Sequence, residues 1–388
     1  MSTSETRTES LDFLKFAIQR VWMAAGATEP HAEAVANAIG FAHQQGKLNQ
    51  GLGVYEAIDI ALCAGALDIE AMPEIIKEGP AWAVVDGHRS SGYYTLDLMA
   101  KTAIEKARTS GIAIVYGGNH NDAGSFSAYV YQAFEQNMMA MASNNSVPLA
   151  APFGGMENLL SCPPFDAIVP SGEQPPIWTS IKLSEFYDAD IAEAVQQGKP
   201  MKGAWCIDPK SGELSDDARP YAKPIEGYGR VWDYSCAGQI ETPRTYSLNL
   251  WNEAMTSIVN PLGTPSTQMP NIEAIEKAMA AGDPVPPTVG GSYFLCINPA
   301  AFGPLEAVIA RSDAYVSAIK SCRPRPGHQV RMPGESGYNN LQSENDDIEV
   351  LTNHWQPFFE NIAGRYGLTE ARLRSEFSER GKSFSRES

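Results

Sequence analysis

The sequence predicts an α/β protein with a mostly parallel central sheet, a helical N-terminal unit and C-terminal helices. Three observations predict this class: helical spacing of apolar residues through the first 70 positions, alternating strand and helix patterns from residue 81, and amphipathic helices after residue 300. A chain of 388 residues is long enough for two domains. We therefore expect residues 1–80 to pack with 330–388, and residues 81–329 to form an α/β domain with a long insertion at 207–242.

The N-terminal unit is predicted from helical periodicity and from helix boundary signals. Apolar residues recur every three to four positions through 11–25, and Gly26 is a stop signal. Thr28 followed by Glu-Pro is typical of an N-cap and first turn, so a second helix is expected over 29–45. A third helix is expected over 53–64.

The α/β domain is predicted from strand and helix patterns that alternate along the chain. This order favours parallel strands joined by crossover helices. The polar tail after residue 380 is expected to fray. The expected strands are 81–87, 112–116, 138–143, 165–170, 177–183 and 291–299, and the expected helices are 94–109, 125–136, 246–259, 303–320 and 348–366.

Composition and residue spacing argue against nucleic acid, a membrane span and a metal site, and they favour one cellular location. The formal net charge of −17 repels polyphosphates, so we expect no nucleic-acid partner. No run of 18 apolar residues exists, so we expect no membrane span. The six cysteines form no CxxC pair and the six histidines show no HxxxH spacing, so no metal site is predicted. Dispersed cysteines without an apolar leader favour a cytoplasmic location.

The common nucleotide and nucleophile motifs are absent. No GxGxxG follows a predicted strand, and the fragment 51-GLGVYE-56 lies between helices. The chain also lacks GxxxxGK[ST] and GxSxG. A bound dinucleotide would therefore not be held in the Rossmann manner.

The segment 117-GGNHNDAG-124 is a candidate site because it joins the strand at 112–116 to a helix. Ligands of open α/β sheets bind beyond the carboxyl ends of strands, and helix N-termini attract anions. His120 can act there as a general acid or base, and Asp122 can orient it or act as a separate acid. The alternative is a loop histidine that caps the helix.

Two further segments have both a functional and a structural interpretation. Arg323, Arg325, His328 and Arg331 form the one basic concentration, which suits a phosphate or carboxylate, or else is a solvated connector. The insertion at 207–242 carries four aromatic residues that suit a larger or aromatic substrate, or else is a surface loop. These residues are Tyr221, Tyr228, Trp232 and Tyr234.

The order of motifs resembles the type 2 malate/L-lactate dehydrogenase family, which includes ureidoglycolate and sulfolactate dehydrogenases and diketogulonate and piperideine-carboxylate reductases. The resemblance covers roughly residues 10–370. Single motifs are weak, but their order is specific. The matching stretches are GKLNQG (46–51), VVDG (84–87), NHNDAG (119–124), NSVPLAAPFGG (145–155), SCPP (161–164), SIKLS (180–184), PRT (243–245) and PGE (333–335).

The resemblance implies an oxidoreductase that uses NAD or NADP on a small 2-hydroxy acid, 2-oxo acid or cyclic imino acid. It implies the family's own non-Rossmann α/β fold, a cofactor- and substrate-binding domain over 81–329, and a homodimer. Hydride transfer is accompanied by movement of one proton, so a proton-carrying group must lie at the substrate oxygen or nitrogen.

The sequence departs from the family pattern at ionisable positions. By position, Gln50 replaces the family's Ser-His-Gly histidine and Ser180 replaces the Asp of D-M-A-T-S. The histidine of Asn-His-x-Gly is kept as His120, with two extra residues before Gly124. We therefore expect His120 to be the acid/base, assisted by Gln50, Asp122 and Ser180, and expect His120→Ala to abolish activity with little loss of stability.

The resemblance also places the cofactor. Lys182 stands where the family has a small residue, so it either pairs with a nucleotide phosphate or faces solvent. The positions that match cofactor-binding segments are Ser146, Ser180, Lys182, Ser184, Arg244, Gly334 and Glu335.

Three functions remain open from the sequence. The first is a dehydrogenase that relies on His120, with a substrate larger or less usual than malate or lactate. The second is a lyase, hydratase or isomerase on the same scaffold that retains a nicotinamide cofactor. The third is a binding protein with a degenerate site.

Overall fold

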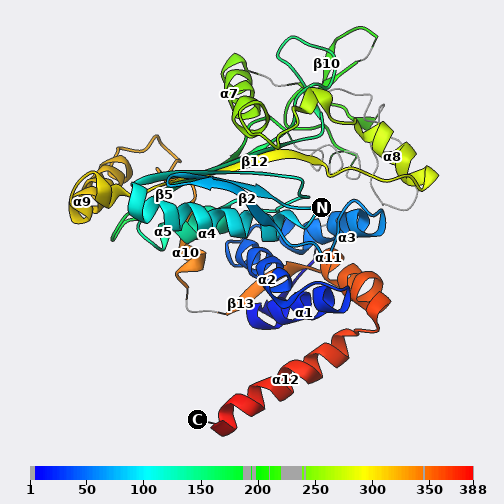
Figure 1. Cartoon of the computed structure of the whole chain (residues 1–388). Helices are drawn as coiled ribbons and strands as arrows, with labels where there is room; N and C mark the ends of the chain where they lie inside the picture. Colours follow the sequence, from blue (N-terminus) through cyan, green and yellow to red (C-terminus); the bar gives the residue numbers. More distant parts are fainter. Residues whose placement is uncertain are drawn as a thin grey trace.

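The computed structural model shows a central seven-stranded sheet with helices on both faces (Figure 1). It describes residues 5–186, 194, 198–208, 210–219, 238–239, 242–343 and 346–387. The strand order is β2-β3-β4-β12-β5-β7-β8, so β8 lies at one edge. The strands are β2 (Glu74–Gly79), β3 (Trp82–Asp86), β4 (Ile112–Gly118), β5 (Met139–Ser146), β7 (Pro164–Val169), β8 (Ile177–Lys182) and β12 (Val289–Ile297).

The prediction of a mostly parallel sheet is wrong. Within this seven-stranded sheet β3 and β4 are the one parallel pair, and the other five pairings are antiparallel. The alternating pattern did predict that β4 and β5 run in the same direction. However, β12 is inserted between them and pairs antiparallel with both. Short connections then fold β2–β3 and β7–β8 into antiparallel pairs.

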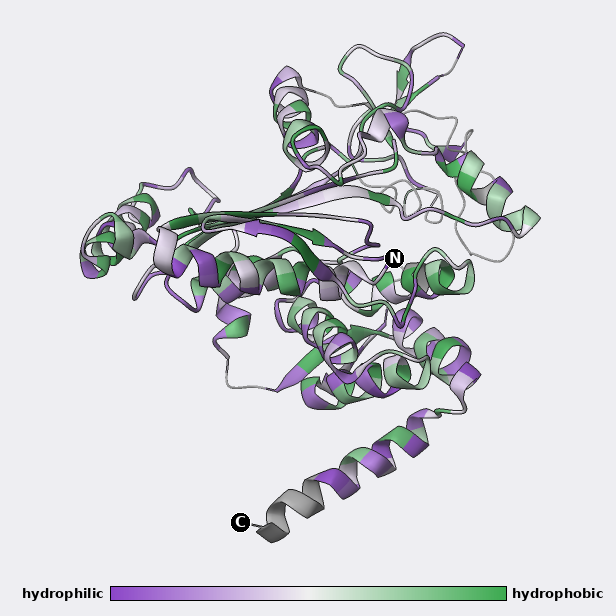
Figure 2. Cartoon of the chain, in the orientation of Figure 1, coloured by the Kyte–Doolittle hydropathy of each residue, from purple (hydrophilic) through white to green (hydrophobic). Residues whose placement is uncertain are grey.

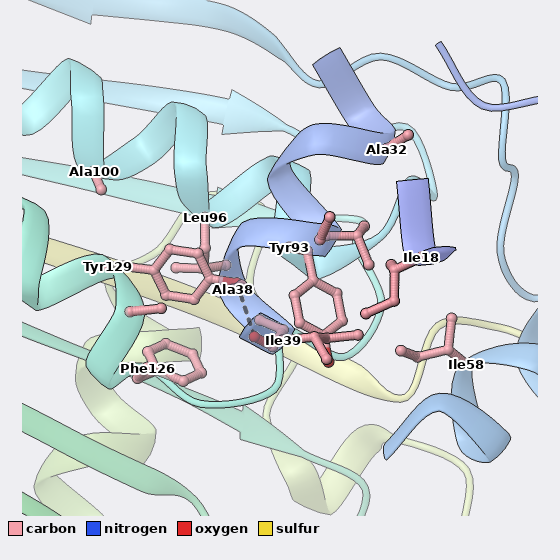
Figure 3. Packing of buried hydrophobic residues seen from close by; sticks show 14 of the residues in the cluster. Ile18, Ala32, Ala38, Ile39, Ile58, Tyr93, Leu96, Ala100, Phe126 and Tyr129 are labelled. Carbon is pink, nitrogen blue, oxygen red and sulfur yellow. Dashed lines mark hydrogen bonds between the residues drawn. The ribbon is translucent and has the colours of Figure 1, made fainter. Parts of the chain in front are cut away.

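Helices α4 (Gly92–Ser110) and α5 (Ser127–Phe134) cover one face of the sheet (Figure 1). The Ser91 hydroxyl caps α4 by accepting from Tyr94 N, and Gly111 ends it in the left-handed conformation. Large side chains fill the space between these helices and α2 (Glu29–Gln44) (Figure 3). Fully buried side chains of this kind each stabilise the fold by about 1.5–3 kcal/mol. They include Ile39, Tyr93, Leu96, Phe126 and Tyr129.

The two ends of the chain meet beneath this layer. Strand β1 (Thr6–Ser10) pairs antiparallel with β13 (Asp347–Leu351), and Phe13 packs against Trp355 and Phe359. Residues 348–366 therefore begin as a strand rather than a helix, because β1 supplies a partner. The helical elements here are α1 (Leu11–Ala24), η1 (Leu48–Gln50), η2 (Leu52–Val54), α3 (Tyr55–Cys63), α11 (Thr352–Pro357), η7 (Phe358–Ile362) and η8 (Ala363–Tyr366).

Helix α12 (Glu370–Glu387) projects away from the body and is mostly hydrophilic (Figure 2). Leu373 is fully buried at its start, and Phe377 packs edge-on against Phe13 with ring centroids 5.7 Å apart. Arg374 donates to the buried carboxylate of Glu9 at 2.7 Å. Helix α12 continues to residue 387, and the expectation that the tail after residue 380 frays stays a prediction.

Helices α7 (Pro243–Glu253) and α8 (Ile272–Ala281) lie on the other face of the sheet (Figure 1). A π-helical turn, η4 (Ala254–Ile258), continues α7 and packs against β12. Gly291 on β12 permits this approach, since a Cβ there would collide with the Thr256 carbonyl oxygen of η4. The remaining elements are β6 (Ala150–Ala151), β9 (Cys206–Ile207), β10 (Leu214–Ser215), β11 (Gly238–Gln239), η5 (Ser266–Gln268), η6 (Pro299–Ala301), α9 (Leu305–Lys320) and α10 (Glu335–Leu341).

The predicted division into domains stays a prediction. Its boundary at 80/81 falls between β2 and β3, which pair with each other. The aromatic residues predicted for the insertion lie outside the described residues. Within the described ranges, no helix is long and apolar enough to cross a membrane.

Candidate active site

A polar cluster lies where the segment after α2 meets α5 and the edge strand β8. The Lys47 ammonium donates to the hydroxyls of Ser127 and Ser180, each at 2.7 Å, and approaches Ser125 Oγ at 3.4 Å. Ser127 lies in the first turn of α5 and Ser180 lies on β8. These contacts join two segments with matching family motifs that are 133 residues apart along the chain.

Asp166 on β7 completes this cluster. Its carboxylate accepts from Ser127 Oγ at 2.6 Å and from Ser180 Oγ at 3.2 Å. Asp166 lies directly opposite Ser180 in the β7–β8 pair, so both side chains point to the face covered by α5. Two hydroxyls therefore bridge the Lys47 ammonium to the Asp166 carboxylate.

Burial shifts both charged groups of the cluster. It lowers the pKa of Lys47, and the negative charge of Asp166 opposes that shift. It also raises the pKa of Asp166, which is only 3% exposed, while Lys47 and the two serine hydroxyls act in the opposite direction. Each ionised group therefore depends on the other, as is expected for a buried charge pair.

Gln50 ends the short helix η1 in the same segment as Lys47. Its side chain is half-buried, and its Oε1 atom is buried without a hydrogen-bond partner. A buried acceptor without a donor costs about 1–3 kcal/mol, which a hydroxyl or N–H group on a ligand would offset. This places an unsatisfied acceptor at the position that matches the family's proton-donating histidine.

His120 is enclosed in the protein, with no exposed surface. Its Nδ1 atom donates to the Asn121 carbonyl at 2.8 Å, so in the neutral ring Nε2 accepts from the Ser292 hydroxyl at 2.9 Å. Burial lowers the pKa of His120 to about 4, so the ring is neutral at pH 7. Both ring nitrogens have protein partners, and this placement does not support a direct contact with substrate.

The residues around His120 hold the loop 119–124 in place. Asn121 donates to the carbonyls of Ala66 and Arg89, each at 3.1 Å. Asp122 is exposed, and its carboxylate accepts from Gly124 N at 2.7 Å, which stabilises the turn. Gly92 at the start of α4 permits close packing, since a Cβ there would lie 2.7 Å from the Asp122 carbonyl carbon. These contacts give the loop 119–124 a structural role.

A second polar group lies under α7, on the other face of the sheet. Glu253 is 7% exposed and accepts from Ser161 Oγ at 2.9 Å, Ser266 Oγ at 2.5 Å and Asn145 Nδ2 at 3.1 Å. Asn249 donates to the carbonyls of Ser161 and Leu183 at 3.0 and 2.9 Å. The segments that match NSVP, SCPP, SIKLS and PRT therefore converge on α7.

The predicted cofactor residues differ in how far they are exposed. Ser180, Lys182 and Ser146 are half-buried, and Arg244 is exposed in the first turn of α7. The hydroxyl of Ser180 donates to Asp166 at 3.2 Å, and that of Ser146 makes a long contact of 3.5 Å with the Val147 carbonyl. Ser184 is buried and donates to the Phe186 carbonyl at 2.7 Å, so its hydroxyl hydrogen is already used.

The PGE segment packs on β8 through Gly334. This glycine has φ 76°, and a Cβ there would lie 2.9 Å from the Trp178 Cβ. Glu335 pairs with Lys320 and accepts from Met332 N at 3.1 Å. The Lys320 ammonium lowers the pKa of Glu335. Glu335 thus stabilises the start of α10, and the backbone of Gly334 is the part that approaches β8.

Three of the predicted cofactor residues carry groups whose chemistry suits a dinucleotide cofactor. The ammonium of Lys182, the guanidinium of Arg244 and the hydroxyl of Ser146 are groups that bind phosphate and ribose oxygens. Arg244 lies on α7, and hydrogen bonds join α7 to the segments that contain Ser146 and Lys182. Lys182 is on the edge strand β8, which Gly334 of the PGE segment contacts at Trp178. A cofactor bound by these groups would be held by side chains on strands and a helix instead of by a glycine-rich phosphate loop.

Sequence reasoning missed Lys47, Asp166 and Glu253. Asp166 had a usable signal, because it is a lone carboxylate in the otherwise apolar strand FDAIVP. Lys47 lies in the GKLNQG segment, but nothing local indicates that it reaches β8. The predicted basic residues between α9 and α10 are exposed, which favours the connector interpretation. Within the part of the chain that the structure describes, no group of His, Cys, Asp or Glu is placed to hold a metal.

Fold and site together define an α/β enzyme without a Rossmann phosphate loop. Residues 10–358 match the family model described as malate/L-lactate dehydrogenase. The chain therefore belongs to the malate/L-lactate dehydrogenase family, whose members are dehydrogenases and reductases that use NAD or NADP.

Curated relatives have several substrates in their names. L-sulfolactate dehydrogenase of Methanocaldococcus jannaschii is 26% identical over 88% of this chain and 92% of its own length. The ureidoglycolate dehydrogenase (NAD(+)) of Escherichia coli O157:H7 is 22% identical over 86% of this chain and 89% of its length. The Delta(1)-pyrroline-2-carboxylate reductase of Ancylobacter novellus is 24% identical over 81% and 86%.

Solved structures confirm the fold class. Sulfolactate dehydrogenase from M. jannaschii superposes with a TM-score of 0.78 at 24% identity, covering 94% of this chain and 98% of that one. Malate dehydrogenase from Entamoeba histolytica gives a TM-score of 0.79 at 21% identity, over 94% and 99%.

Proposed function

We propose that this protein is an oxidoreductase that uses NAD or NADP to interconvert a 2-hydroxy acid and a 2-oxo acid, or an imino acid and its reduced form. The observation that carries the proposal is the contact between Lys47 and Ser180, at 2.7 Å. It joins the segments that match the family's Ser-His-Gly and D-M-A-T-S motifs, and it puts a proton-carrying ammonium between them.

The cofactor would be held by Ser146, Lys182 and Arg244, with the Gly334 backbone against β8. When bound, the nicotinamide supplies or accepts a hydride. The chain's own contribution is to bind the phosphates with cations, to orient the substrate and to move one proton. A local ammonium and guanidinium also attract an anionic cofactor and substrate to a chain whose formal net charge is −17.

The substrate is proposed to be larger or less usual than malate or lactate. Two ionisable side chains of the family are neutral here: Gln50 stands in place of a histidine, and Ser180 in place of an aspartate. Gln50 Oε1 lacks a protein partner, which suits a substrate that presents a hydroxyl or N–H donor. The range of acids and cyclic imines among the relatives supports this breadth.

The prediction that His120 is the acid/base stays a prediction. For that role the loop 119–124 would have to open, and both hydrogen bonds of the ring would have to break. The Lys47 cluster needs a smaller rearrangement, because Lys47 and Ser180 are half-buried rather than enclosed and the longest contact of the ammonium, to Ser125 Oγ at 3.4 Å, is the one that a substrate would replace.

The proposal is tested with a panel of sulfolactate, malate, L-lactate, ureidoglycolate and Δ1-pyrroline-2-carboxylate. Absorbance at 340 nm reports the redox state of the nicotinamide, and chromatography reports the organic product. We expect a change at 340 nm equal in amount to the product formed. Product formed without net change at 340 nm would favour the second candidate function, a lyase, hydratase or isomerase. The homodimer is a separate proposal, for which light scattering should give about twice the 42.0 kDa chain mass.

A further inference from the structure

The cluster around Lys47 contains the groups of a proton-transfer chain: an ammonium, two hydroxyls and a carboxylate. Lys47 is the donor, Ser127 and Ser180 each accept from it, and both hydroxyls donate onward to Asp166. Every hydroxyl hydrogen in this path has an assigned acceptor. Because the path is closed at the carboxylate, the ammonium is held in one position.

Accessibility separates the members of the cluster. Asp166 is 3% exposed and Ser127 is fully buried, so neither is presented to a ligand. Lys47 and Ser180 are half-buried and lie beside the edge strand β8. Of the two ionisable groups in the cluster, Lys47 is therefore the more exposed.

The electrostatic surroundings suit a group that gains and loses a proton. Burial favours the neutral amine of Lys47, whereas Asp166 favours the ammonium. Among the described residues, Asp166 on β7 is the charged group that acts on Lys47, while α5 and β8 present hydroxyls to it. Its pKa therefore lies below that of an ordinary lysine, and a lysine whose pKa is lowered in this way gains and loses its proton more readily.

We propose that Lys47 is the catalytic acid and base of this enzyme, and that Asp166 positions it through the hydroxyls of Ser127 and Ser180. The proposal rests on the oxidoreductase function above. In reduction, the Lys47 N–H bond breaks and an O–H or N–H bond forms on the substrate as its neighbouring carbon gains the hydride. The substrate is reduced, the nicotinamide is oxidised, and the neutral amine regains a proton from water. Oxidation runs the same steps in reverse.

The first test reads the titration of Lys47 without any turnover. Trace acetylation with acetic anhydride, followed by peptide mass spectrometry from pH 6 to 11, gives the midpoint of reactivity of each lysine. Lys277, whose side chain is 74% exposed, is the internal control. We expect a lower midpoint for Lys47 than for Lys277, and a still lower one in Asp166→Asn. Equal midpoints for the two lysines, or no response to Asp166→Asn, would overturn the proposal.

The second test separates chemistry from binding. Lys47→Arg keeps the charge but cannot release a proton, and Lys47→Met removes the charge at similar size. With Δ1-pyrroline-2-carboxylate as the reduction probe and sulfolactate and malate as oxidation probes, we expect kcat to fall about 100-fold or more in both variants. KM should change little in Lys47→Arg. Lys277→Met is the matched control and should behave as wild type.

Chemical rescue distinguishes a proton carrier from a structural lysine. Methylamine and ethylamine should restore part of the activity of Lys47→Ala, and the pH dependence should follow the pKa of the added amine. As pH rises through the Lys47 midpoint, the wild-type kcat for reduction should fall, because the ammonium is the acid. The kcat for oxidation should rise, because the neutral amine is the base. Full activity of Lys47→Met would refute Lys47 as the acid/base and leave the oxidoreductase standing. Failure of wild type to bind any nicotinamide would instead refute the oxidoreductase, while the acetylation result would stand.

Discussion

At the scale of single residues, His120 is the position where the structure most changes the expectation from sequence. Its ring bonds to Asn121 and Ser292 inside the core. We expect His120→Gln to lower the free energy of unfolding by about 1–3 kcal/mol, because at least one buried partner loses its hydrogen bond. Urea unfolding at pH 7.5 measures this change.

The matched control for this substitution is His328→Gln. His328 is exposed in the connector between α9 and α10, so its replacement should stay within about 0.5 kcal/mol of wild type. Turnover per folded molecule should survive in His120→Gln. Unchanged stability together with loss of kcat would restore the original prediction of an acid/base at His120.

Gln50 is the second informative residue, because it occupies the position of a family histidine. We expect Gln50→His to raise kcat/KM for malate or L-lactate, since an imidazole there adds a proton carrier suited to small 2-hydroxy acids. Initial rates at 340 nm measure this. Unchanged low rates on both acids would show that Gln50 does not set substrate choice.

At the scale of elements, the packing of the η4 turn on β12 depends on glycine. A Cβ at Gly291 would collide with the Thr256 carbonyl oxygen of η4, whereas a Cβ at Gly303 would meet nothing within 4 Å. We expect Gly291→Ala to destabilise the protein by about 1–3 kcal/mol through overpacking. Thermal and urea unfolding should show Gly303→Ala close to wild type. Equal effects of the two substitutions would mean that this contact does not constrain α7.

Most elements were predictable from local pattern, but their partners were not. The apolar run of β12 was expected as a strand, yet its place between β4 and β5 joins segments about 150–180 residues apart. Strand β13 was expected as helix, because its pairing with β1 comes from the opposite end of the chain. Periodicity reports which face of an element is apolar, and it carries no information on distant pairing.

The same limit applies to the site. His120, Gln50 and Ser180 were singled out by motif order, which depends only on sequence. The contact between Lys47 and Ser180 depends on how the segment after α2 crosses to the edge strand, so no local pattern indicates it. Burial of His120 was hidden for the same reason.

At the scale of the whole molecule, three buried histidines couple stability to pH. Burial lowers the pKa of His31, His43 and His120 to about 4 in the folded protein. Unfolded histidine binds a proton near pH 6.5, so the unfolded state takes up protons first as pH falls from about 6.5 to about 4. Stability therefore decreases on acidification across this window.

The expected size of this effect is up to about 2 kcal/mol for each histidine between pH 6.5 and 5. Urea midpoints measured at half-unit intervals should fall steadily from pH 7 to pH 5, before most carboxylates titrate. His31→Gln should make the unfolding free energy depend less steeply on pH, by the contribution of one bound proton. A midpoint that stays constant across this range would contradict the buried, neutral state of these rings.

The central claim is that this chain binds a nicotinamide cofactor on its non-Rossmann sheet. Calorimetric titration of NADH and of NADPH into the purified protein tests it most directly, with Arg244→Ala and Lys182→Ala as companions. We predict saturable binding of at least one cofactor at one site per chain, weakened about tenfold or more in the variants that lose a phosphate partner. No binding of either cofactor at millimolar concentration would contradict the account.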